Sequence, residues 1–165
     1  MMNYKTKAKR DRILSDLIDV RRCILETTPR VPTSILGQIF LGFWSIKELL
    51  AHLIGWDFTN IEAARAVKDG RLPNFYTYID KDWRSYNALL VIQYRREDYD
   101  LLLSCVSDSH RQLIDFLETL PVEDFFGDWG VRYRGIKVTI SRLLEAETKD
   151  EKVHLEQINA FEKQP

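Results

Sequence analysis

Apolar residues recur every three or four positions in four long stretches of the chain, at about residues 7–28, 45–69, 99–120 and 138–161. This spacing places apolar side chains on one face of a helix and charged side chains on the other. A shorter stretch, 81–95, shows the same pattern just before the third long one. Four long amphipathic helices in a chain of this length predict an all-α fold, namely a four-helix bundle.

Short sequence signals mark where these helices begin and how they are connected. Ser45 and Glu48 form a capping box at the start of the second helix. Residues 70–80 open with a glycine, which caps the end of that helix, and they lack periodicity; a connection of this length can cross the bundle. We therefore expect helices two and three to run parallel, with helix four antiparallel to both. The aperiodic segments 31–44 and 122–135 are expected to be an ordered loop and a turn-rich link.

Composition agrees with a compact helical protein. The 165-residue chain is 45% hydrophobic and 30% charged, and its 7 Gly and 5 Pro are too few for the turns of a β-sandwich or barrel. We therefore expect a single domain over residues 1–165. The net charge of -1 argues against a protein that neutralises phosphates, and the basic run 5–12 is interpreted as the solvated start of the first helix rather than a nucleic-acid-binding arm.

Two further features bear on the compartment. The N-terminal residues lack the apolar core of a secretory signal, and the most apolar stretch, 35–44, is too short to span a membrane. Cys23 and Cys105 both fall within helical patterns, where we expect buried, reduced thiols. These features favour a cytoplasmic protein with neither a nucleic-acid nor a membrane partner.

The fourth helix carries ionisable residues on its apolar face. On a helical wheel with about 100° per residue, Glu147, Asp150, Glu151 and His154 fall within the arc that the apolar residues define. Unpaired buried charge is costly, so these side chains are expected to pair with one another or to bind an ion. Asp150 and His154 are four residues apart, project from one side of the helix and suit two ligands of one metal ion.

His52 on the second helix completes a candidate metal site. It lies about two turns from the start of its helix, and His154 lies about two turns from the end of the fourth, so antiparallel helices would bring the imidazoles level. Two histidines and a carboxylate leave open coordination positions and suit zinc, nickel, iron or manganese. An open position could activate water or a thiol. The alternative is a structural polar layer in which His52, Asp150 and His154 hydrogen-bond to one another.

Three further sets of residues could contribute to this site. His110 falls on the core face of the third helix and is either a fourth ligand or a core histidine with satisfied hydrogen bonds. Glu147 could replace the aspartate as the acidic ligand. Trp56, Trp83 and Tyr86 could line a pocket, although aromatic residues at the ends of a bundle usually serve packing.

The sequence also resembles a known family. The stretch WSIKELLAHLIGW at 44–56 is similar to the start of the second helix of DinB-like proteins, and 145–158, which ends in HLEQI, is similar to their fourth-helix site. Looser likenesses are Trp83 with Asn87 and the segment 120–124, which holds Leu-Pro and an aspartate. The nearest likeness is to the branch that contains the colibactin-resistance protein ClbS and its DfsB relatives.

This resemblance implies a four-helix bundle with a long left-handed crossover between helices two and three. It also implies a divalent metal, often nickel or zinc, at positions that His52, Asp150 and His154 occupy. Many members have histidine where this chain has Asp150, and an acid there is similar to thiol-dependent isomerases of the superfamily. ClbS-type members lack the histidine triad and act without metal, so a metal-free alternative stays open.

The hypothesis is therefore a DinB-like stress or detoxification protein that uses a divalent metal to activate water or a thiol against a small electrophile. It would be a hydrolase or a thiol-dependent transferase, in which Glu147 or Glu151 could orient a group or move a proton; no catalytic residue can be assigned. One alternative is a ClbS-like protein that binds or hydrolyses a reactive metabolite without metal. Another is a non-catalytic dimeric stress protein. We expect a small-molecule ligand, no organic cofactor and, from the resemblance, a homodimer.

Overall fold

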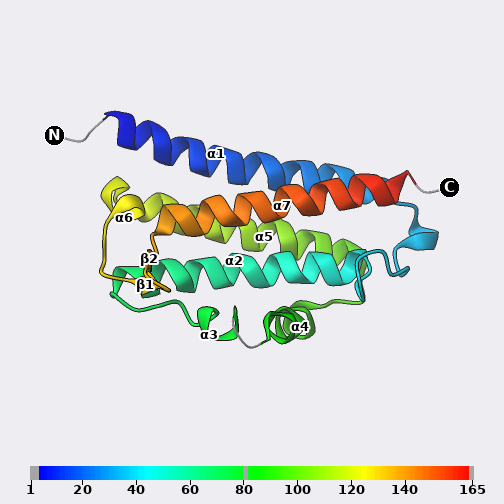
Figure 1. Cartoon of the computed structure of the whole chain (residues 1–165). Helices are drawn as coiled ribbons and strands as arrows, with labels where there is room; N and C mark the ends of the chain where they lie inside the picture. Colours follow the sequence, from blue (N-terminus) through cyan, green and yellow to red (C-terminus); the bar gives the residue numbers. More distant parts are fainter. Residues whose placement is uncertain (1–3, 80–81, 164–165) are drawn as a thin grey trace.

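The computed structural model describes residues 4–79 and 82–163 (Figure 1). Four long helices dominate it: α1 (Tyr4–Thr27), α2 (Ile46–Lys68), α5 (Tyr99–Thr119) and α7 (Ile140–Glu162). The shorter elements are two 3-10 helices (Thr28–Arg30 and Thr33–Ile35), the helices α3 (Tyr76–Ile79), α4 (Trp83–Tyr94) and α6 (Val122–Phe126), and the strands β1 (Arg132–Tyr133) and β2 (Ile136–Lys137). The ends of the expected domain, 1–3 and 164–165, and residues 80–81 of the expected connection and helix lie outside the described residues.

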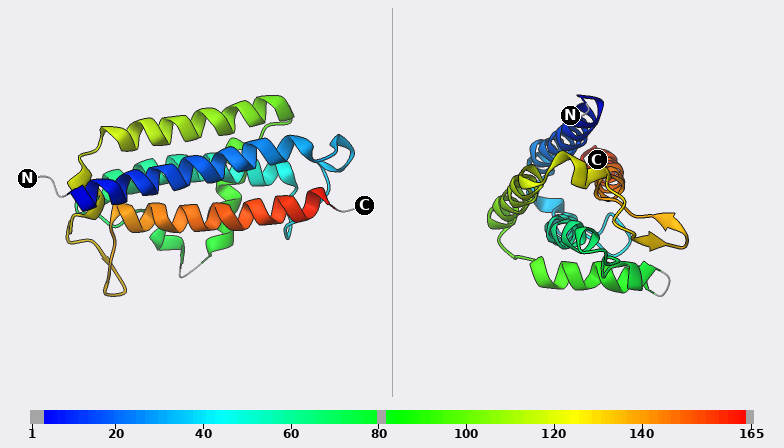
Figure 2. Two further views of the ribbon diagram at one scale, coloured as in Figure 1. Left: turned by 90° about the horizontal axis from the view of Figure 1, so that it is seen from above. Right: turned by 90° about the vertical axis from the view of Figure 1, so that its left-hand side faces the viewer.

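The four long helices confirm the predicted all-α bundle. Helices α1 and α7 run in one direction, and α2 and α5 run in the other (Figures 1 and 2). Helix α1 packs mainly on α7, and α2 packs mainly on α5. Because α2 and α5 are parallel, the chain has to return along the bundle between them, as the aperiodic segment after the second helix predicted.

The connection between α2 and α5 is longer than the pattern alone indicated. It covers residues 69–98, so the helical stretch that precedes the third long helix belongs to the crossover, as α4. Helix α4 packs on α2 and lies nearly perpendicular to the bundle axis (Figure 2). The views of Figures 1 and 2 together give the crossover a left-handed sense, as the resemblance implied.

Gly55 of α2 allows α4 to lie this close. A Cβ atom at Gly55 would be 2.6 Å from Cβ of Leu90 on α4, far inside van der Waals contact. A glycine within a helix costs about 1 kcal/mol relative to alanine, so the close packing of the two helices must outweigh that cost. This contact sets the position of α4, which forms one wall of the cavity described below.

The segment 122–135 is more ordered than a turn-rich link. It contains α6 and β1, and β1 forms an antiparallel hairpin with β2, which follows the segment directly. The two turn residues, Arg134 and Gly135, both have positive φ (49° and 78°), as a tight two-residue hairpin turn requires.

The start of α2 agrees with the prediction from the sequence: Ser45 and Glu48 form the expected capping box.

A buried ionic cluster joins all four long helices. Arg21 of α1 forms bidentate ion pairs with Asp57 of α2 (2.8 and 3.0 Å) and with Glu151 of α7 (2.6 and 3.0 Å). Ser109 of α5 donates a hydrogen bond to Oδ2 of Asp57 (2.6 Å), and Nδ1 of His110 lies 3.5 Å from Oδ1 of Asp57. All five residues are buried, and apolar core residues fill the bundle on either side of them.

Two expectations about the chain as a whole can be compared with the fold. Within the described residues, no helix combines the length and apolarity that a membrane crossing requires. Cys23 and Cys105 are free thiols, but both are partly exposed rather than buried as the pattern predicted. Each lies at the edge of the apolar face of its helix, where the wheel separates buried from exposed positions poorly.

Candidate metal centre and its cavity

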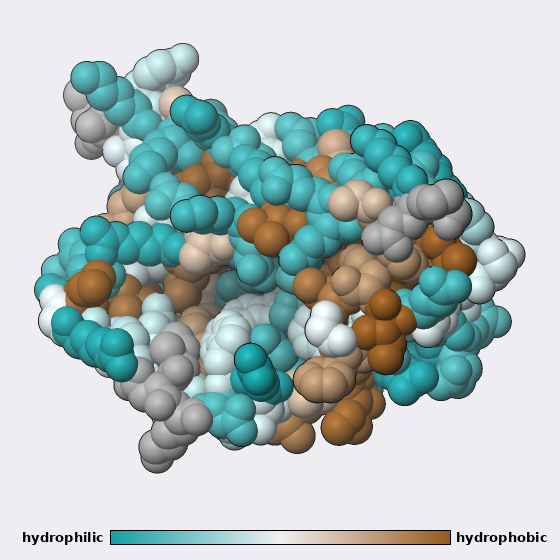
Figure 3. Space-filling model, turned by 45° about the vertical axis from the view of Figure 1, so that its right-hand side comes forward, coloured by the Kyte–Doolittle hydropathy of each residue, from teal (hydrophilic) through white to brown (hydrophobic). Residues whose placement is uncertain are grey.

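A cavity of about 570 Å³ lies between α7 and the layer that contains α3 and α4. The surface is hollowed on this face of the molecule (Figure 3). Small-molecule sites commonly occupy about 300–1,000 Å³, so the cavity is large enough for a ligand. Its walls are formed by Trp44, His52, Trp56, Asn60, Phe75, Tyr76, Trp83, Asn87, Tyr133, Ile136, Lys137, Val138, Arg142, Leu143, Ala146, Glu147, Asp150 and His154.

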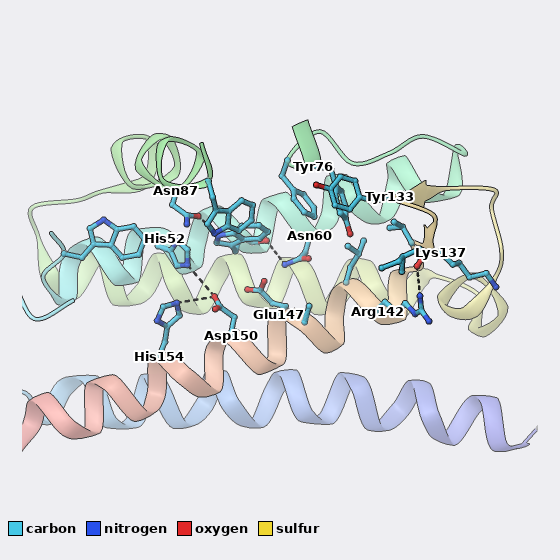
Figure 4. A pocket seen from close by; sticks show the side chains of 18 residues that line it. His52, Asn60, Tyr76, Asn87, Tyr133, Lys137, Arg142, Glu147, Asp150 and His154 are labelled. Atoms are coloured by element: carbon cyan, nitrogen blue, oxygen red, sulfur yellow. Dashed lines mark hydrogen bonds and ion pairs between the residues drawn. The ribbon is translucent and has the colours of Figure 1, made fainter. Parts of the chain in front are cut away.

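The three expected ligand residues lie together at one end of the cavity (Figure 4). Nε2 of His154 is 3.3 Å from Oδ2 of Asp150, and Nε2 of His52 is 3.9 Å from the same oxygen. The two imidazole rings are 5.3 Å apart between centroids and nearly perpendicular (83°). Potential ligand atoms of all three residues lie within 4.8 Å of one another. The antiparallel helices α2 and α7 therefore bring the two histidines level.

The two imidazoles are held in different ways. Nδ1 of His154 is 2.8 Å from Oε1 of Gln157. Because Oε1 can only accept, a neutral His154 ring carries its hydrogen on Nδ1 and keeps the lone pair of Nε2 toward Asp150. His52 packs against the ring of Trp44 at 4.8 Å between centroids, and its buried Nδ1 has no hydrogen-bond partner among the described residues. A hydrogen bond thus orients His154, whereas packing orients His52.

The protonation states of the three groups are linked. Burial lowers the pKa of His52, although Asp150 opposes this effect. Burial also disfavours a charge on His154, but the interaction with Asp150 outweighs it and raises the pKa of His154. The interactions with His154 and then His52 lower the pKa of Asp150. Near neutral pH the group therefore offers an ionised carboxylate and at least one neutral imidazole.

The donor set and its spacing fit a divalent ion. Imidazole nitrogens and carboxylate oxygens bind such ions at about 2.0–2.2 Å, which places neighbouring ligand atoms roughly 3.0–3.5 Å apart. The separation of His154 from Asp150 falls within this range, and that of His52 from Asp150 exceeds it by less than half an ångström. Three protein ligands leave at least one coordination position for water or a substrate atom.

Glu147 lies in the cavity wall but outside the group of potential ligand atoms. Its side chain is buried, and burial together with the nearby carboxylate of Glu151 raises the pKa of Glu147 well above its usual value. A neutral carboxyl group can donate a hydrogen bond or a proton into the cavity. In this structure Glu147 therefore lines the cavity beside the triad, and Asp150 is the acidic residue whose carboxylate groups with the two histidines.

Glu151 and His110 belong to the buried ionic cluster and do not line the cavity. Glu151 forms an ion pair with Arg21 inside the bundle, whereas Asp150 and His154 line the cavity. His110 groups with Asp57 and Glu151 in a second set of potential ligand atoms. Arg21 already binds both carboxylates of this set, and His110 therefore lies apart from the triad instead of supplying a fourth ligand.

Aromatic side chains form part of the cavity wall. Trp56 and Trp83 both line it, with their rings 5.2 Å apart between centroids. Nε1 of Trp56 donates a hydrogen bond to Oδ1 of Asn87 (3.2 Å). Tyr86 packs beside Trp56 at 5.8 Å but does not line the cavity, and its hydroxyl pairs with Oγ1 of Thr59 (2.8 Å). The wall therefore suits an apolar or aromatic ligand.

The sequence reasoning missed the buried cluster and the far end of the cavity. Arg21 lies on the same helical face as Leu17 and Ile24, both fully buried, so a charge within an apolar face is the signal that could have revealed it. Asp57 interrupts the apolar face of α2 in the same way. No periodic signal marks Arg142, because a cavity wall is formed by residues from several distant segments.

The fold and the site define a class of protein: a helical bundle with two histidines and a carboxylate in the wall of a ligand-sized cavity. A comparison with protein families matches residues 17–158 to the DinB superfamily, and the chain belongs to this superfamily. The comparisons with curated proteins and with solved structures gave no match. The family match is to the superfamily as a whole, so the resemblance to the ClbS/DfsB branch stays a prediction.

Proposed function

We propose that this protein binds a divalent metal ion at His52, Asp150 and His154 and acts on a small electrophile in the adjacent cavity. The observation that carries the proposal is the convergence of three ligand atoms within 4.8 Å at one end of a cavity of about 570 Å³. Zinc, nickel, manganese and iron(II) all accept such a donor set. When bound, the ion supplies Lewis-acid chemistry that lowers the pKa of a water or a thiol.

The surrounding residues support this chemistry. Gln157 holds His154 with Nε2 available as a ligand, which is the role that outer hydrogen-bond partners play at metal sites. Trp56 and Trp83 present apolar surface that displaces water from a bound substrate. Glu147 lines the same cavity, and burial raises its pKa, which favours a role as proton donor to the leaving group.

Metal analysis of protein purified without added ion tests the first step. The wild type is expected to hold about one divalent ion per chain, and a His52→Ala/His154→Ala variant is expected to hold almost none. The chain has three histidines, so His110→Gln is the matched control and should retain the ion. Equal, low metal content in the wild type and the double variant would contradict the proposal. Melting temperatures measured with added nickel, zinc and manganese give a second readout, since an ion that binds the folded state raises them.

A second candidate is a ClbS-like protein that binds or hydrolyses a reactive metabolite without metal. It is favoured by the distance of 3.3 Å between Nε2 of His154 and Oδ2 of Asp150, and by the raised pKa of His154, because a protonated His154 can pair with the carboxylate without a metal ion. In that case a chelator leaves ligand binding and any hydrolysis unchanged. Loss of activity on chelation, with recovery when one metal is restored, would instead support the metal-dependent function.

A further inference from the structure

The two ends of the cavity differ in charge. At one end lie the Asp150 carboxylate and the two imidazoles, and at the other lie Lys137 and Arg142 (Figure 4). Arg142 and Asp150 both belong to α7, eight residues apart, which corresponds to about 12 Å along the helix. The apolar rings of Trp56 and Trp83 belong to the wall of the same cavity. A ligand that follows this cavity therefore meets the cationic side chains of Lys137 and Arg142 at the end away from the triad.

Arg142 is the cation that is free to bind a ligand. Among the described residues it forms no ion pair, and one guanidinium nitrogen, Nη1, donates a hydrogen bond to the carbonyl oxygen of Lys137 (2.8 Å). Its remaining N–H groups are available to an acceptor in the cavity. Lys137, by contrast, already lies 3.4 Å from Oδ2 of Asp128, which is itself paired with Arg132. Because Lys137 is already paired, Arg142 is the stronger candidate for binding an anionic group of a ligand.

We propose that the cavity accepts an elongated, apolar or aromatic molecule with an anionic group at one end, which Arg142 binds. The planar guanidinium is suited to carboxylate, sulfonate or phosphate oxygens, and the charge of Lys137 nearby adds to the positive potential. The orientation of the substrate rests on the function proposed above: the anionic group lies at Arg142, and the reactive group lies at His52, Asp150 and His154.

A pair of fluorescent probes tests the anion site without knowledge of the natural substrate. Anilinonaphthalene sulfonate is an aromatic anion, and N-phenylnaphthylamine has the same ring skeleton without the sulfonate. Titrations use the full chain after treatment with a chelator, so that the result does not depend on metal. Arg142→Gln is expected to weaken binding of the sulfonate by about tenfold, as for one charged hydrogen bond, and to change binding of the neutral probe by less than about twofold.

Matched variants locate the effect. Arg12→Gln removes an exposed arginine of α1 that lies outside the cavity and should change neither probe. Ala146→Trp places a large side chain in the cavity wall and should weaken both. Lys137→Gln should weaken the sulfonate less than Arg142→Gln does, because Lys137 is already paired with Asp128. Added salt should weaken the sulfonate in the wild type more than in Arg142→Gln.

Three results would overturn the proposal. The first is equal weakening of both probes by Arg142→Gln, and the second is no weakening of the sulfonate by that variant or by Ala146→Trp. The third is a greater loss of sulfonate binding in His154→Ala than in Arg142→Gln, which would place the anion at the triad. Metal analysis is independent of all three, so the anion site can fail while the metal site holds, and the reverse.

Discussion

Replacing Arg21 with methionine should destabilise this protein more than any exposed charge replacement. The side chains of Arg21, Asp57 and Glu151 are 1%, 0% and 1% exposed, and four hydrogen bonds link the guanidinium to the two carboxylates. Without the cation, two buried carboxylates lose their partner, which typically costs about 3–5 kcal/mol. In a chain of this size, 1 kcal/mol corresponds to about 2–4 °C in Tm. We therefore expect Arg21→Met to lower Tm by roughly 6–20 °C.

Urea unfolding followed by circular dichroism measures this free energy, and the adjacent arginine provides the control. Arg22 pairs with Asp19 at 2.6 Å, but both side chains are exposed, and such pairs contribute about 0–1 kcal/mol. Arg22→Met should therefore change stability by less than about 1 kcal/mol. If Arg21→Met lowers the free energy of unfolding by no more than Arg22→Met does, burial does not strengthen the contribution of the ionic cluster to stability, and the reasoning is wrong.

Two further measurements separate loss of the cation from loss of packing. In Arg21→Met/Asp57→Asn/Glu151→Gln no charge is left unpaired, so this variant should recover much of the stability. The pH dependence gives the second. Burial acts to raise the pKa of Asp57, but the charge of Arg21 outweighs this effect, so the pKa of Asp57 is lowered in the folded wild type. The ion pair therefore stabilises the wild type above about pH 4, and its contribution is lost as the pH falls. Without Arg21, burial raises that pKa, and the variant loses stability as the pH rises. The difference between the two proteins should thus shrink from pH 7 to pH 4.

Three other predictions concern the site and its walls. Gly55→Ala should destabilise the protein by about 1–2 kcal/mol, because the new Cβ would clash with Leu90 and the better helix propensity of alanine offsets only part of that cost. Gly37→Ala is the control, since Gly37 has open space around it, and equal changes in the free energy of urea unfolding for the two variants would contradict the close contact. Glu147→Gln should stabilise the protein at pH 7 by about 0.5–2 kcal/mol, because burial raises the pKa of Glu147 and the stabilising contribution of this carboxyl group is lost as the pH rises above about 4.3. A gain in Tm of the variant that persists at pH 4 would refute this. Gln157→Ala should weaken zinc binding in calorimetric titrations by about 10–100-fold, whereas Gln157→Glu keeps a hydrogen-bond acceptor for His154 and should preserve most of the zinc affinity. An equal loss of zinc affinity in both variants would exclude the proposed role of Gln157 in orienting His154.

The elements that could be predicted from the sequence are those that local periodicity encodes. The four long helices, the Ser45–Glu48 capping box and the parallel arrangement of the second and third helices all follow from spacing and turn residues close together in the chain. The placement of α4 across α2 does not, because it depends on the contact between Gly55 and Leu90, which are far apart in sequence. The β1–β2 hairpin has strands of two residues each, too short for a period to show.

The candidate site was accessible from the sequence only in part, and α7 shows why. A helical wheel assigns Glu147, Asp150, Glu151 and His154 to one broad arc, but successive residues differ by about 100° in direction. In the structure Glu151 faces Arg21 inside the bundle, while Asp150 and His154 face the cavity. The wheel identifies the buried charges, but the partners on other helices decide which of them share a site.

The ionic cluster and the triad are therefore coupled through the rotation of α7. The bidentate pair with Arg21 fixes the direction of Glu151, and because Asp150 precedes it by one residue, the same contact fixes the direction of Asp150. Rotating α7 enough to bring Glu151 into the cavity would break this pair and turn Asp150 away from His52. Since Asp57 holds the other side of Arg21, α2, which carries His52, is tied to the same guanidinium. One buried arginine thus sets the mutual orientation of the two helices that supply the candidate metal ligands.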